Sequence, residues 1–375
     1  MTNFTGLNLV QPLLRALETE GYATPTPIQT KTIPLLLAGR DVVGIAQTGT
    51  GKTAAFALPI LQRLAANAVR PEPKSVRALV LAPTRELAGQ IADSFKTYGR
   101  NMALRSDVVF GGVPIARQIS RLAPGVDILV ATPGRLLDLV RQNRVRLDRV
   151  EVFILDEADR MLDMGFIPDV KRIAALLPKR HQTALFSATM PGAIQSLAAS
   201  LLTDPAHVEA APASTTVDRV EQHVMFVDKA GKRAALTRIL KDDSVGRVLV
   251  FTRTKHGANK VVRQLDQDGV RANAIHGNKS QSARTKALAE FKSGRTPVLV
   301  ATDIASRGID VDGITHVINF ELPNEPESYV HRIGRTARAG AAGVAISLVD
   351  SAERSVLRDI ERTIRQKLTI QQQRA

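Results

Sequence analysis

The chain has 375 residues, of which 44% are hydrophobic and 23% are charged, a composition typical of a globular protein with two or three domains. It has no cysteine, which excludes disulfides, thiolate metal sites and a cysteine nucleophile; with 4% aromatic residues and no tryptophan, we expect no broad base-stacking platform. Lysine and arginine outnumber aspartate and glutamate by 51 to 36, and the net charge of +15 favours a polyanionic partner, although it also fits a basic protein without one.

The first residues of the chain contain no basic segment that leads into an apolar core, so we expect no signal peptide. Farther along, no apolar run approaches the roughly 20 residues that a membrane helix needs. The sequence therefore predicts a cytoplasmic protein that does not bind a membrane.

Short apolar runs alternate along the chain with longer stretches that have the apolar spacing of helices. The runs cover residues 42–46, 78–82, 128–131 and 152–155, and helical spacing is found in residues 53–65 and 86–98. Alternation of this kind predicts parallel strands joined by right-handed helical crossovers, which is the doubly wound α/β class.

The second half of the chain repeats the first at a constant offset. Residues 79–81 align with residues 249–251, and residues 128–132 align with residues 298–302, in both cases 170 positions farther on. Two short apolar matches can arise by chance, but the shared offset favours a duplicated domain. A small and polar segment with one proline predicts a linker between the halves. We expect a first domain over 1–208, a linker over 209–217 and a second domain over 218–375.

A phosphate-binding loop is predicted directly after the first apolar run, where a strand would pass into a helix. Gly49 and Gly51 allow backbone N–H groups to converge on phosphate oxygens, Lys52 adds a positive charge, and the Thr53 hydroxyl can bind Mg²⁺. Ala46 stands where the general pattern has glycine, and the segment by itself would also fit a glycine-rich turn. The predicted nucleotide contacts of this loop are Ala46, Gln47, Thr48, Gly49, Thr50, Gly51, Lys52 and Thr53.

Two acidic residues follow the apolar run 152–155. Asp156 can hold Mg²⁺, and Glu157 can orient and deprotonate an attacking water molecule. The carboxyl end of a buried parallel strand is where α/β folds place their ligands. An acidic cluster here is also common at a helix amino terminus, but the phosphate loop in the same half favours the catalytic interpretation.

The second half contains a basic segment at residues 331–338. Arg335 and Arg338 are three positions apart, so they lie on one side if the segment is helical. ATP hydrolysis develops negative charge in its transition state, and arginines delivered by closure of the two halves would stabilise it. A solvated basic helix would have the same pattern, and this segment taken alone favours that simpler interpretation.

Together these motifs resemble those of the DEAD-box RNA helicases of superfamily 2, whose name is spelled by residues 156–159. The resemblance covers nearly the whole chain and implies two tandem RecA-like domains, each a parallel β-sheet flanked by helices. Residues 21–29 are similar to the family's Q motif, which implies that Gln29 hydrogen-bonds adenine and that Tyr22 packs on its face, with Phe4 seventeen positions before Gly21.

The resemblance also implies further contacts in both halves. Ser187 and Thr189 are similar to a motif that links the ATP state to strand separation through His331, and Gly308 and Asp310 would reach the ribose and phosphate side of the nucleotide. The RNA contacts would come from hydroxyl, backbone N–H and guanidinium groups, which bind phosphates without reading bases. These are Pro83, Thr84, Arg85, Gly112, Thr132, Pro133, Gly134, Arg135, Arg253, Gly277, Gln281, Arg284, Thr302 and Asp303.

The implied activity is an RNA-dependent ATPase that uses ATP and Mg²⁺ to unwind short RNA duplexes or to remodel RNA–protein complexes. We expect a monomer with roles in ribosome assembly or RNA decay. Two alternatives remain open: an ATP-gated RNA clamp that acts mainly as a binding module, and a DNA helicase or translocase with the same two-domain plan. Within the family, residues 46–56 and the compact amino terminus are similar to the bacterial RhlE type.

Overall fold

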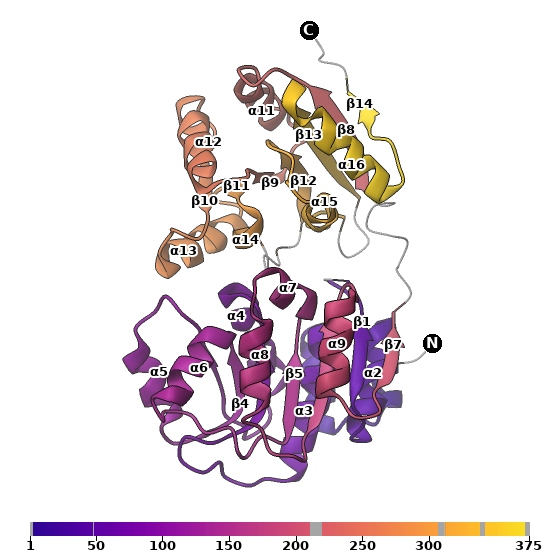
Figure 1. Ribbon diagram of the computed structural model, residues 1–375, viewed down its shortest axis with the longest axis vertical. Coiled ribbons are helices and arrows are strands. Elements are labelled where there is room, and N and C mark those ends of the chain that lie inside the picture. Colours follow the sequence, from indigo (N-terminus) through magenta and orange to yellow (C-terminus); the bar gives the residue numbers. More distant parts are fainter. Residues whose placement is uncertain are drawn as a thin grey trace. The chain divides into compact units, whose positions relative to one another are not determined.

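The computed structural model describes residues 3–47, 49–210, 220–306, 311, 313–337 and 342–371. The chain forms two compact units, residues 1–212 and 213–375 (Figure 1). Of the expected linker 209–217, Glu209 is the last residue of strand β7 (Ala206–Glu209), and residues 211–217 lie outside the described part.

The first unit is built on a sheet of seven parallel strands in the order β3-β4-β2-β5-β6-β1-β7. The central strands are wholly buried because helices cover both faces, and this burial explains their uninterrupted apolar sequences. The other six strands are β1 (Val42–Ile45), β2 (Val76–Leu81), β3 (Ser106–Val109), β4 (Val126–Ala131), β5 (Val152–Leu155) and β6 (Gln182–Ser187).

Alternate residues of the strands enter two hydrophobic cores, one on each face of the sheet. Val80 and Ile154 pack with residues of α1 to α4, whereas Leu79 and Phe153 pack with residues of α6 to α9. This arrangement is the doubly wound class that the sequence predicts. The helices are η1 (Phe4–Leu7), α1 (Gln11–Thr19), α2 (Pro27–Leu37), α3 (Lys52–Ala66), α4 (Arg85–Tyr98), α5 (Ile115–Leu122), α6 (Pro133–Arg141), α7 (Ala158–Asp163), α8 (Ile167–Ala174) and α9 (Gly192–Leu201).

The second unit has a parallel sheet in the order β10-β11-β9-β12-β13-β8-β14. Position by position this is the order of the first sheet: β9 and β11 stand where β2 and β4 stand, and these are the strands that the offset of 170 relates. The structure thus confirms the duplicated fold. The strands are β8 (Val220–Phe226), β9 (Arg247–Phe251), β10 (Ala272–Ile275), β11 (Val298–Ala301), β12 (Ile314–Asn319), β13 (Gly343–Val349) and β14 (Thr369–Ile370).

Helices also cover both faces of the second sheet. Val250 and Ile318 pack with α11 and α12, whereas Leu249 and Phe251 pack on the opposite face with Phe291 of α13. The helices of this unit are α11 (Lys232–Leu240), α12 (Lys255–Gln267), α13 (Gln281–Lys292), α14 (Asp303–Ser306), α15 (Pro326–Ile333), η2 (Ser351–Glu353) and α16 (Arg354–Ile364).

Candidate functional site

The carboxyl edge of the first sheet carries two groups of predicted site residues. The phosphate loop, the acidic residues and the coupling residues follow β1, β5 and β6, whereas the predicted RNA contacts follow β3, β4 and β2. β2 and β5 are neighbours in the sheet, and their last paired residues are Leu81 and Leu155. The edge therefore has a nucleotide half and an RNA half, defined by these predictions, that meet at one strand pair.

The phosphate loop connects β1 to the amino terminus of α3. Gly49 and Gly51 have φ angles of 85° and 88°, a left-handed backbone that favours glycine, and Gly51 is the N-cap of α3. The Lys52 side chain is buried, and its Nζ donates a hydrogen bond to the Ala46 carbonyl at 2.7 Å. The Lys52 ammonium group is thus held by a backbone carbonyl at the start of its own loop. Thr48 lies outside the described residues.

Gln29, the predicted adenine contact, is attached to the phosphate loop. Its Oε1 accepts a hydrogen bond from the Thr26 backbone N–H at 2.9 Å, which caps α2, and its Nε2 donates to the Gly51 carbonyl at 3.1 Å. A Cβ atom at Gly51 would lie 2.4 Å from Gln29 Nε2. The residue at position 51 therefore has to be glycine for its backbone conformation and also for the space that Gln29 takes.

The two aromatic residues expected near adenine differ in exposure. Tyr22 is 46% exposed, and its ring lies 6.2 Å from the ring of Tyr98. Phe4 is buried at 4% exposure within the core beside α1 to α4, so its ring serves the packing of the first unit.

The acidic pair lies at the end of β5 and is almost fully buried. Burial raises the pKa of Asp156 to about 6, against the opposing effect of the nearby Lys52 ammonium. Glu157 has a left-handed backbone, with φ and ψ both 54°, which is uncommon for a residue other than glycine. Its Oε2 lies 3.4 Å from Nε of the buried Arg160. A strained residue beside a perturbed carboxylate is typical of a catalytic position.

The fit of a metal ion to this region can be tested on the donor atoms. Among the described residues, no three His, Cys, Asp or Glu side chains gather closely enough to hold a metal ion by themselves. Asp156 and Thr53 offer oxygen donors, and Mg²⁺ characteristically uses one or two carboxylates together with substrate phosphates and waters. A buried carboxylate whose charge is disfavoured by burial is a good position for such a cation, so these residues fit Mg²⁺ with a bound nucleotide.

The coupling residues Ser187 and Thr189 contact the last acid of the DEAD sequence. Asp159 Oδ2 accepts hydrogen bonds from the backbone N–H of Thr189 at 3.1 Å and from its hydroxyl at 3.2 Å. The Asp159 backbone N–H donates to Ser187 Oγ at 3.1 Å, and this hydroxyl donates to the Thr189 carbonyl at 2.7 Å. Asp159 was not among the predicted site residues, although its place in the same tetrapeptide could have identified it.

The RNA half of the first unit brings its predicted residues together. Thr84 caps α4, because its Oγ1 accepts a hydrogen bond from the Leu87 N–H at 3.2 Å. The guanidinium of Arg85 occupies the space beside Gly112, where a Cβ atom would lie 2.0 Å from Arg85 Nη1. Arg135 donates to the Val113 carbonyl at 3.3 Å. Pro83 is buried between β2 and α4, and the other predicted contacts, Thr132, Pro133 and Gly134, form the N-cap and first turn of α6.

The second unit repeats the RNA half of this division. Its predicted RNA contacts follow β9 (Arg253), β10 (Gly277, Gln281, Arg284) and β11 (Thr302, Asp303), the same half of the sheet as in the first unit. Thr254 caps α12 through a hydrogen bond from the Gly257 N–H at 3.0 Å, as Thr84 caps α4, and the two threonines are 170 positions apart. Thr254 was missed as a site residue, and the repeat offset could have found it.

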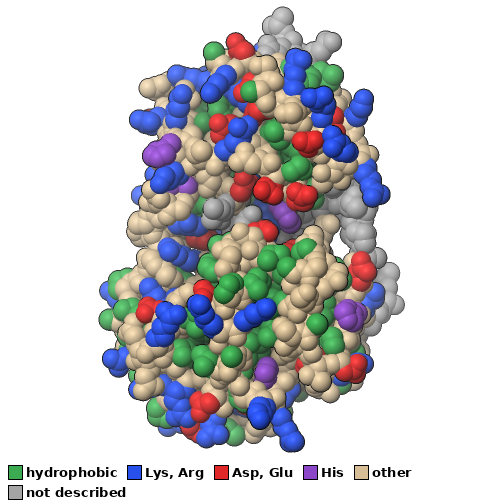
Figure 2. All heavy atoms as spheres, viewed as in Figure 1, with side chains coloured by type: hydrophobic (Ala, Val, Ile, Leu, Met, Phe, Trp, Pro, Cys, Tyr) green, Lys and Arg blue, Asp and Glu red, His purple; other side chains and the backbone are tan. Residues whose placement is uncertain are grey.

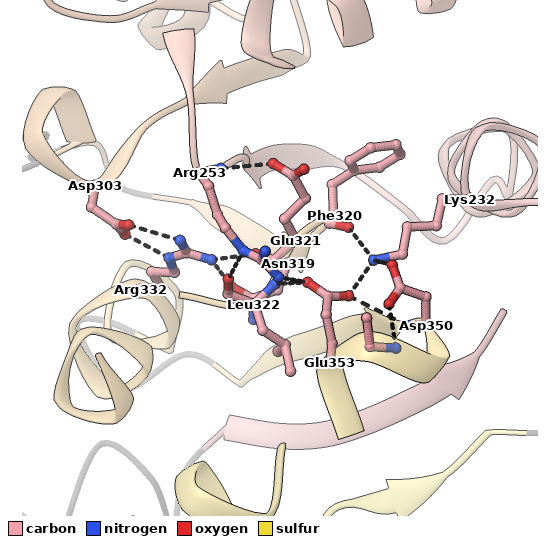
Figure 3. A network of polar contacts seen from close by, with 11 residues as sticks. Lys232, Arg253, Asp303, Asn319, Phe320, Glu321, Leu322, Arg332, Asp350 and Glu353 are labelled. Carbon is pink, nitrogen blue, oxygen red and sulfur yellow. Dashed lines mark hydrogen bonds and ion pairs between the residues drawn. The ribbon is translucent and has the colours of Figure 1, made fainter. Parts of the chain in front are cut away.

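Three cations bind three successive backbone carbonyls after β12 (Figure 3). Lys232 Nζ donates to the Phe320 carbonyl at 3.1 Å, Arg332 Nη1 to that of Glu321 at 2.6 Å, and Arg253 Nε to that of Leu322 at 2.8 Å. We call Lys232, Arg253 and Arg332 the three-cation cluster. It holds in place the chain that leads directly into α15, the helix that carries His331.

Three carboxylates neutralise the three-cation cluster, and one of them is Asp350, whose Oδ2 lies 3.4 Å from Lys232 Nζ (Figure 3). Glu353, at 3% exposure, pairs with both Lys232 and Arg253 and accepts the Leu322 N–H at 3.0 Å. Asp303 forms two hydrogen bonds with Arg332, at 2.6 and 2.8 Å. Of these residues the sequence predicted only Arg253 and Asp303, because the partners are far apart along the chain and belong to no local motif.

Two of the remaining predicted residues of the second unit, His331 and Arg335, lie in α15 or just after it. His331 lies in the helix, and Arg335, two residues after its end, donates from Nε to the His331 carbonyl at 3.3 Å. The second predicted arginine finger, Arg338, and the predicted nucleotide contacts Gly308 and Asp310 lie outside the described residues.

Comparison with known proteins bears on this arrangement. Residues 26–197 match the family model DEAD/DEAH box helicase, and residues 231–340 match the model helicase conserved C-terminal domain. The chain is 44% identical over 365 residues to the DEAD-box ATP-dependent RNA helicase CshA of Bacillus subtilis (strain 168), covering 97% of this chain and 73% of that protein. CshA of Geobacillus kaustophilus is 44% identical over 368 residues, which are 98% of this chain and 78% of that protein.

Solved structures show the same likeness. Saccharomyces cerevisiae Dbp5 bound to RNA and ADP BeF3 is similar with a TM-score of 0.87 at 32% identity, covering 99% of this chain and 96% of that one. A DEAD box protein from the hyperthermophile Methanococcus jannaschii is 41% identical with a TM-score of 0.55, covering 99% of each chain.

The chain therefore belongs to the DEAD-box family of ATP-dependent RNA helicases, and it is an enzyme of that class. Its two sheets are the tandem RecA-like domains that the sequence resemblance predicts. The relatives above carry the CshA name, so the RhlE-type assignment stays a prediction. Within the described part of the chain, no helix has the length and apolar character needed to cross a membrane.

Proposed function

We propose that the chain is an RNA-dependent ATPase that unwinds short RNA duplexes, or remodels RNA–protein complexes, when ATP and RNA draw its two units together. The observation that carries this proposal is the division of the carboxyl edge of the first sheet, which sets predicted nucleotide residues beside predicted RNA residues, while the second sheet carries its predicted RNA residues on the corresponding half. For ATP binding to change the RNA contacts, the nucleotide residues and the RNA residues have to be coupled, and a shared β-sheet provides this coupling. The relatives named as ATP-dependent RNA helicases support the same reading.

ATP binding is assigned to the phosphate loop and the Q motif. The Lys52 ammonium leaves the Ala46 carbonyl and pairs with the phosphates, while the amino terminus of α3 adds its partial positive charge. Gln29 is assigned to adenine binding and also donates a hydrogen bond to the Gly51 carbonyl, so adenine binding would affect the conformation of the phosphate loop. Gly308 and Asp310 are assigned to the ribose and phosphate side.

Hydrolysis is assigned to Glu157, which accepts the proton of the attacking water. Asp156 and Thr53 would hold Mg²⁺ together with the phosphates, and the ion would supply positive charge against the developing negative charge. Arg335 and Arg338 stabilise the transition state from the second unit, a contribution on the order of 10³ or more in rate for arginine fingers. Ser187 and Thr189 form hydrogen bonds with Asp159. They are assigned to transmit the state of the bound nucleotide to the second unit through His331.

RNA binding is assigned to backbone contacts in both units. The side chains involved are hydroxyl and guanidinium donors at strand and helix ends, which suit phosphate oxygens and carry no base-reading pattern. Ribonucleoprotein complexes are therefore proposed as substrates through their exposed RNA strands.

ATP turnover with RNA, with single-stranded DNA and without nucleic acid tests the proposal against its alternatives. The proposal expects strong stimulation by RNA and little by DNA. Equal stimulation by both would favour a DNA helicase or translocase. An RNA complex that persists through slow turnover without strand separation would favour the RNA clamp.

Glu157→Gln is expected to convert the enzyme into a long-lived RNA complex with ATP. The glutamine keeps the shape of the side chain but cannot accept the proton, so hydrolysis drops steeply while Lys52, Thr53 and Asp156 still bind ATP. Because the coupling of ATP and RNA is reciprocal, blocked hydrolysis removes the main exit from the closed state. RNA dissociation measured with ATP and with ADP checks this, and equal lifetimes under the two nucleotides would contradict closure of the units.

A further inference from the structure

The second unit has a groove whose lining contains none of the predicted site residues. Its volume is ≈ 700 Å³, and it runs between one face of α12 and one face of α13, across the edge strand β10. His256 and Arg263 line it from α12, Lys286 and Glu290 from α13, and Lys279 from the loop after β10. We call it the α12–α13 groove.

The α12–α13 groove carries an excess of positive charge. Three permanent cations, Arg263, Lys279 and Lys286, stand against one carboxylate, that of Glu290. This carboxylate is engaged already: it accepts a hydrogen bond from Asn273 Nδ2 at 2.8 Å and lies 3.8 Å from Lys286 Nζ. Arg263 and Lys286 are both exposed, and the carboxylate of Glu290 offsets only one of the three cations, so the groove keeps a positive excess that a ligand can meet.

Two further observations agree with a positive potential here. The pKa of His276, beside the groove, is lowered first by burial and then by the cations around it, among them Lys279 and Arg284. Figure 2 shows Lys, Arg and His side chains on the side of the second unit where Figure 1 draws α12 and α13, and Lys and Arg on the opposite side as well. The charge is therefore a property of the region and not of one side chain.

The groove is continuous with the predicted RNA contacts of the second unit. Lys279 lies between Gly277 and Gln281 in the loop after β10, and the groove residue Ala283 directly precedes Arg284 in α13. A strand held by Gly277, Gln281 and Arg284 has the groove as its next positive surface. An acidic peptide would meet the same charges, but this continuity favours RNA.

We propose that the α12–α13 groove binds the phosphate backbone of single-stranded RNA flanking the nucleotides held by the predicted motif contacts. The inference rests on the proposed RNA-binding function and extends it to a second, sequence-independent segment of RNA. Such a segment adds affinity through counterion release, so its contribution depends on RNA length and on salt.

The test compares two oligouridines, of about six and about twelve nucleotides, with the full chain and an ATP analogue that is not hydrolysed. For the wild type, the longer RNA is expected to bind about tenfold or more tightly than the shorter one. Arg263→Ala/Lys286→Ala should reduce this ratio by about tenfold and make the salt dependence for the longer RNA less steep by about 1.4 in log–log slope.

The matched control is Arg238→Ala/Lys241→Ala, which removes two exposed cations, one in α11 and one at its C-cap, that line a different depression of the same unit. It should leave the ratio at the wild-type value. An unchanged affinity ratio in Arg263→Ala/Lys286→Ala would contradict RNA binding in the groove. Binding of an acidic peptide in the groove without a length effect for RNA would contradict it as well. A wild type that binds neither oligouridine would instead contradict the proposed RNA-binding function itself.

Discussion

Burial of Asp156 at the end of β5 makes its charge depend on what else occupies the site. Burial raises its pKa to about 6 from 3.8, with Lys52 opposing the shift. Since the pKa is raised on folding, this group stabilises the first unit below about pH 4, and its contribution is lost as the pH rises through about 6. A metal ion needs the opposite protonation state, because only the ionised carboxylate is a ligand.

Mg²⁺-dependent ATP binding is therefore expected to weaken below about pH 6, by roughly tenfold per pH unit, as protons compete for Asp156. Calorimetric titration with Mg·ATP between about pH 5 and pH 8 measures this dependence. Asp156→Asn is the control, because it keeps the titration of ATP itself and removes that of the side chain. If wild type and variant weaken in parallel, Asp156 does not hold the metal.

At the amino terminus of α3, Gly51 is required both for its left-handed backbone conformation and for the space that the Gln29 side chain takes. Gly51→Ala is expected to cost about 1–2 kcal/mol of stability from its left-handed backbone and also to displace Gln29 or the loop, weakening ATP binding about tenfold. Gly39→Ala is the matched control, since Gly39 has a similar φ of 78° but nothing within 4 Å of the added Cβ. Measured ATP affinity should fall for position 51 alone, and an equal loss at both positions would assign the effect to backbone strain.

The segment after β12 depends on the carboxylate of Glu353. Glu353→Gln removes the charge that pairs with Lys232 and Arg253, so we expect a loss of about 3 kcal/mol in the free energy of unfolding of the second unit. Asp359→Asn, which breaks the exposed pair with Arg362, should cost less than about 0.5 kcal/mol. Urea unfolding of the full chain, followed by a probe in the second unit, compares them, and similar midpoints would mean that the three-cation cluster needs no buried carboxylate.

Local sequence patterns were sufficient to predict the central strands of the first sheet and its adjoining helices, but not the edge strands. The strands β2, β4 and β5 are wholly buried, so their apolar runs are visible in the sequence, and α3 and α4 lie within one residue of their predicted stretches. The edge strands β3 and β7 are only partly buried and contain polar residues such as Asp107 and His207, so they have no such run. Partial burial tolerates polar residues within a short strand and leaves no apolar run to recognise.

For the candidate site, motifs predicted which residues gather at the carboxyl edge but not what holds them. Parallel strands bring their carboxyl ends to one edge, so residues such as Asp156 and Thr84 could be expected there. The contact of Gln29 with the Gly51 carbonyl and the pairing of Lys232 with Glu353 join residues far apart in the chain. Contacts of this kind have no sequence spacing of their own, and only the folded structure reveals them.

Over the whole molecule, the net charge of +15 and the phosphate-directed donors predict salt-sensitive RNA binding. If about five phosphates meet Lys or Arg, the logarithm of the affinity for single strands should fall with the logarithm of salt concentration at a slope near −3 to −4. Fluorescence anisotropy over a salt series measures the slope, with strands of different sequence as the control. A flat profile together with a strong sequence preference would contradict backbone recognition.

The backbone hydrogen bonds that join the two halves of each sheet, between β2 and β5 and between β9 and β12, continue beyond the ends of these strands. In the first unit the Asp156 N–H donates to the Leu81 carbonyl at 3.0 Å, and in the second the Phe320 N–H donates to the Phe251 carbonyl at 3.0 Å. The distance between the strands of either pair is one inter-strand spacing, about 4.8 Å. A shift of the nucleotide side by more than a few tenths of an ångström must therefore either move the RNA side with it or break these hydrogen bonds. Each sheet thus acts as a rigid connection between its nucleotide side and its RNA side.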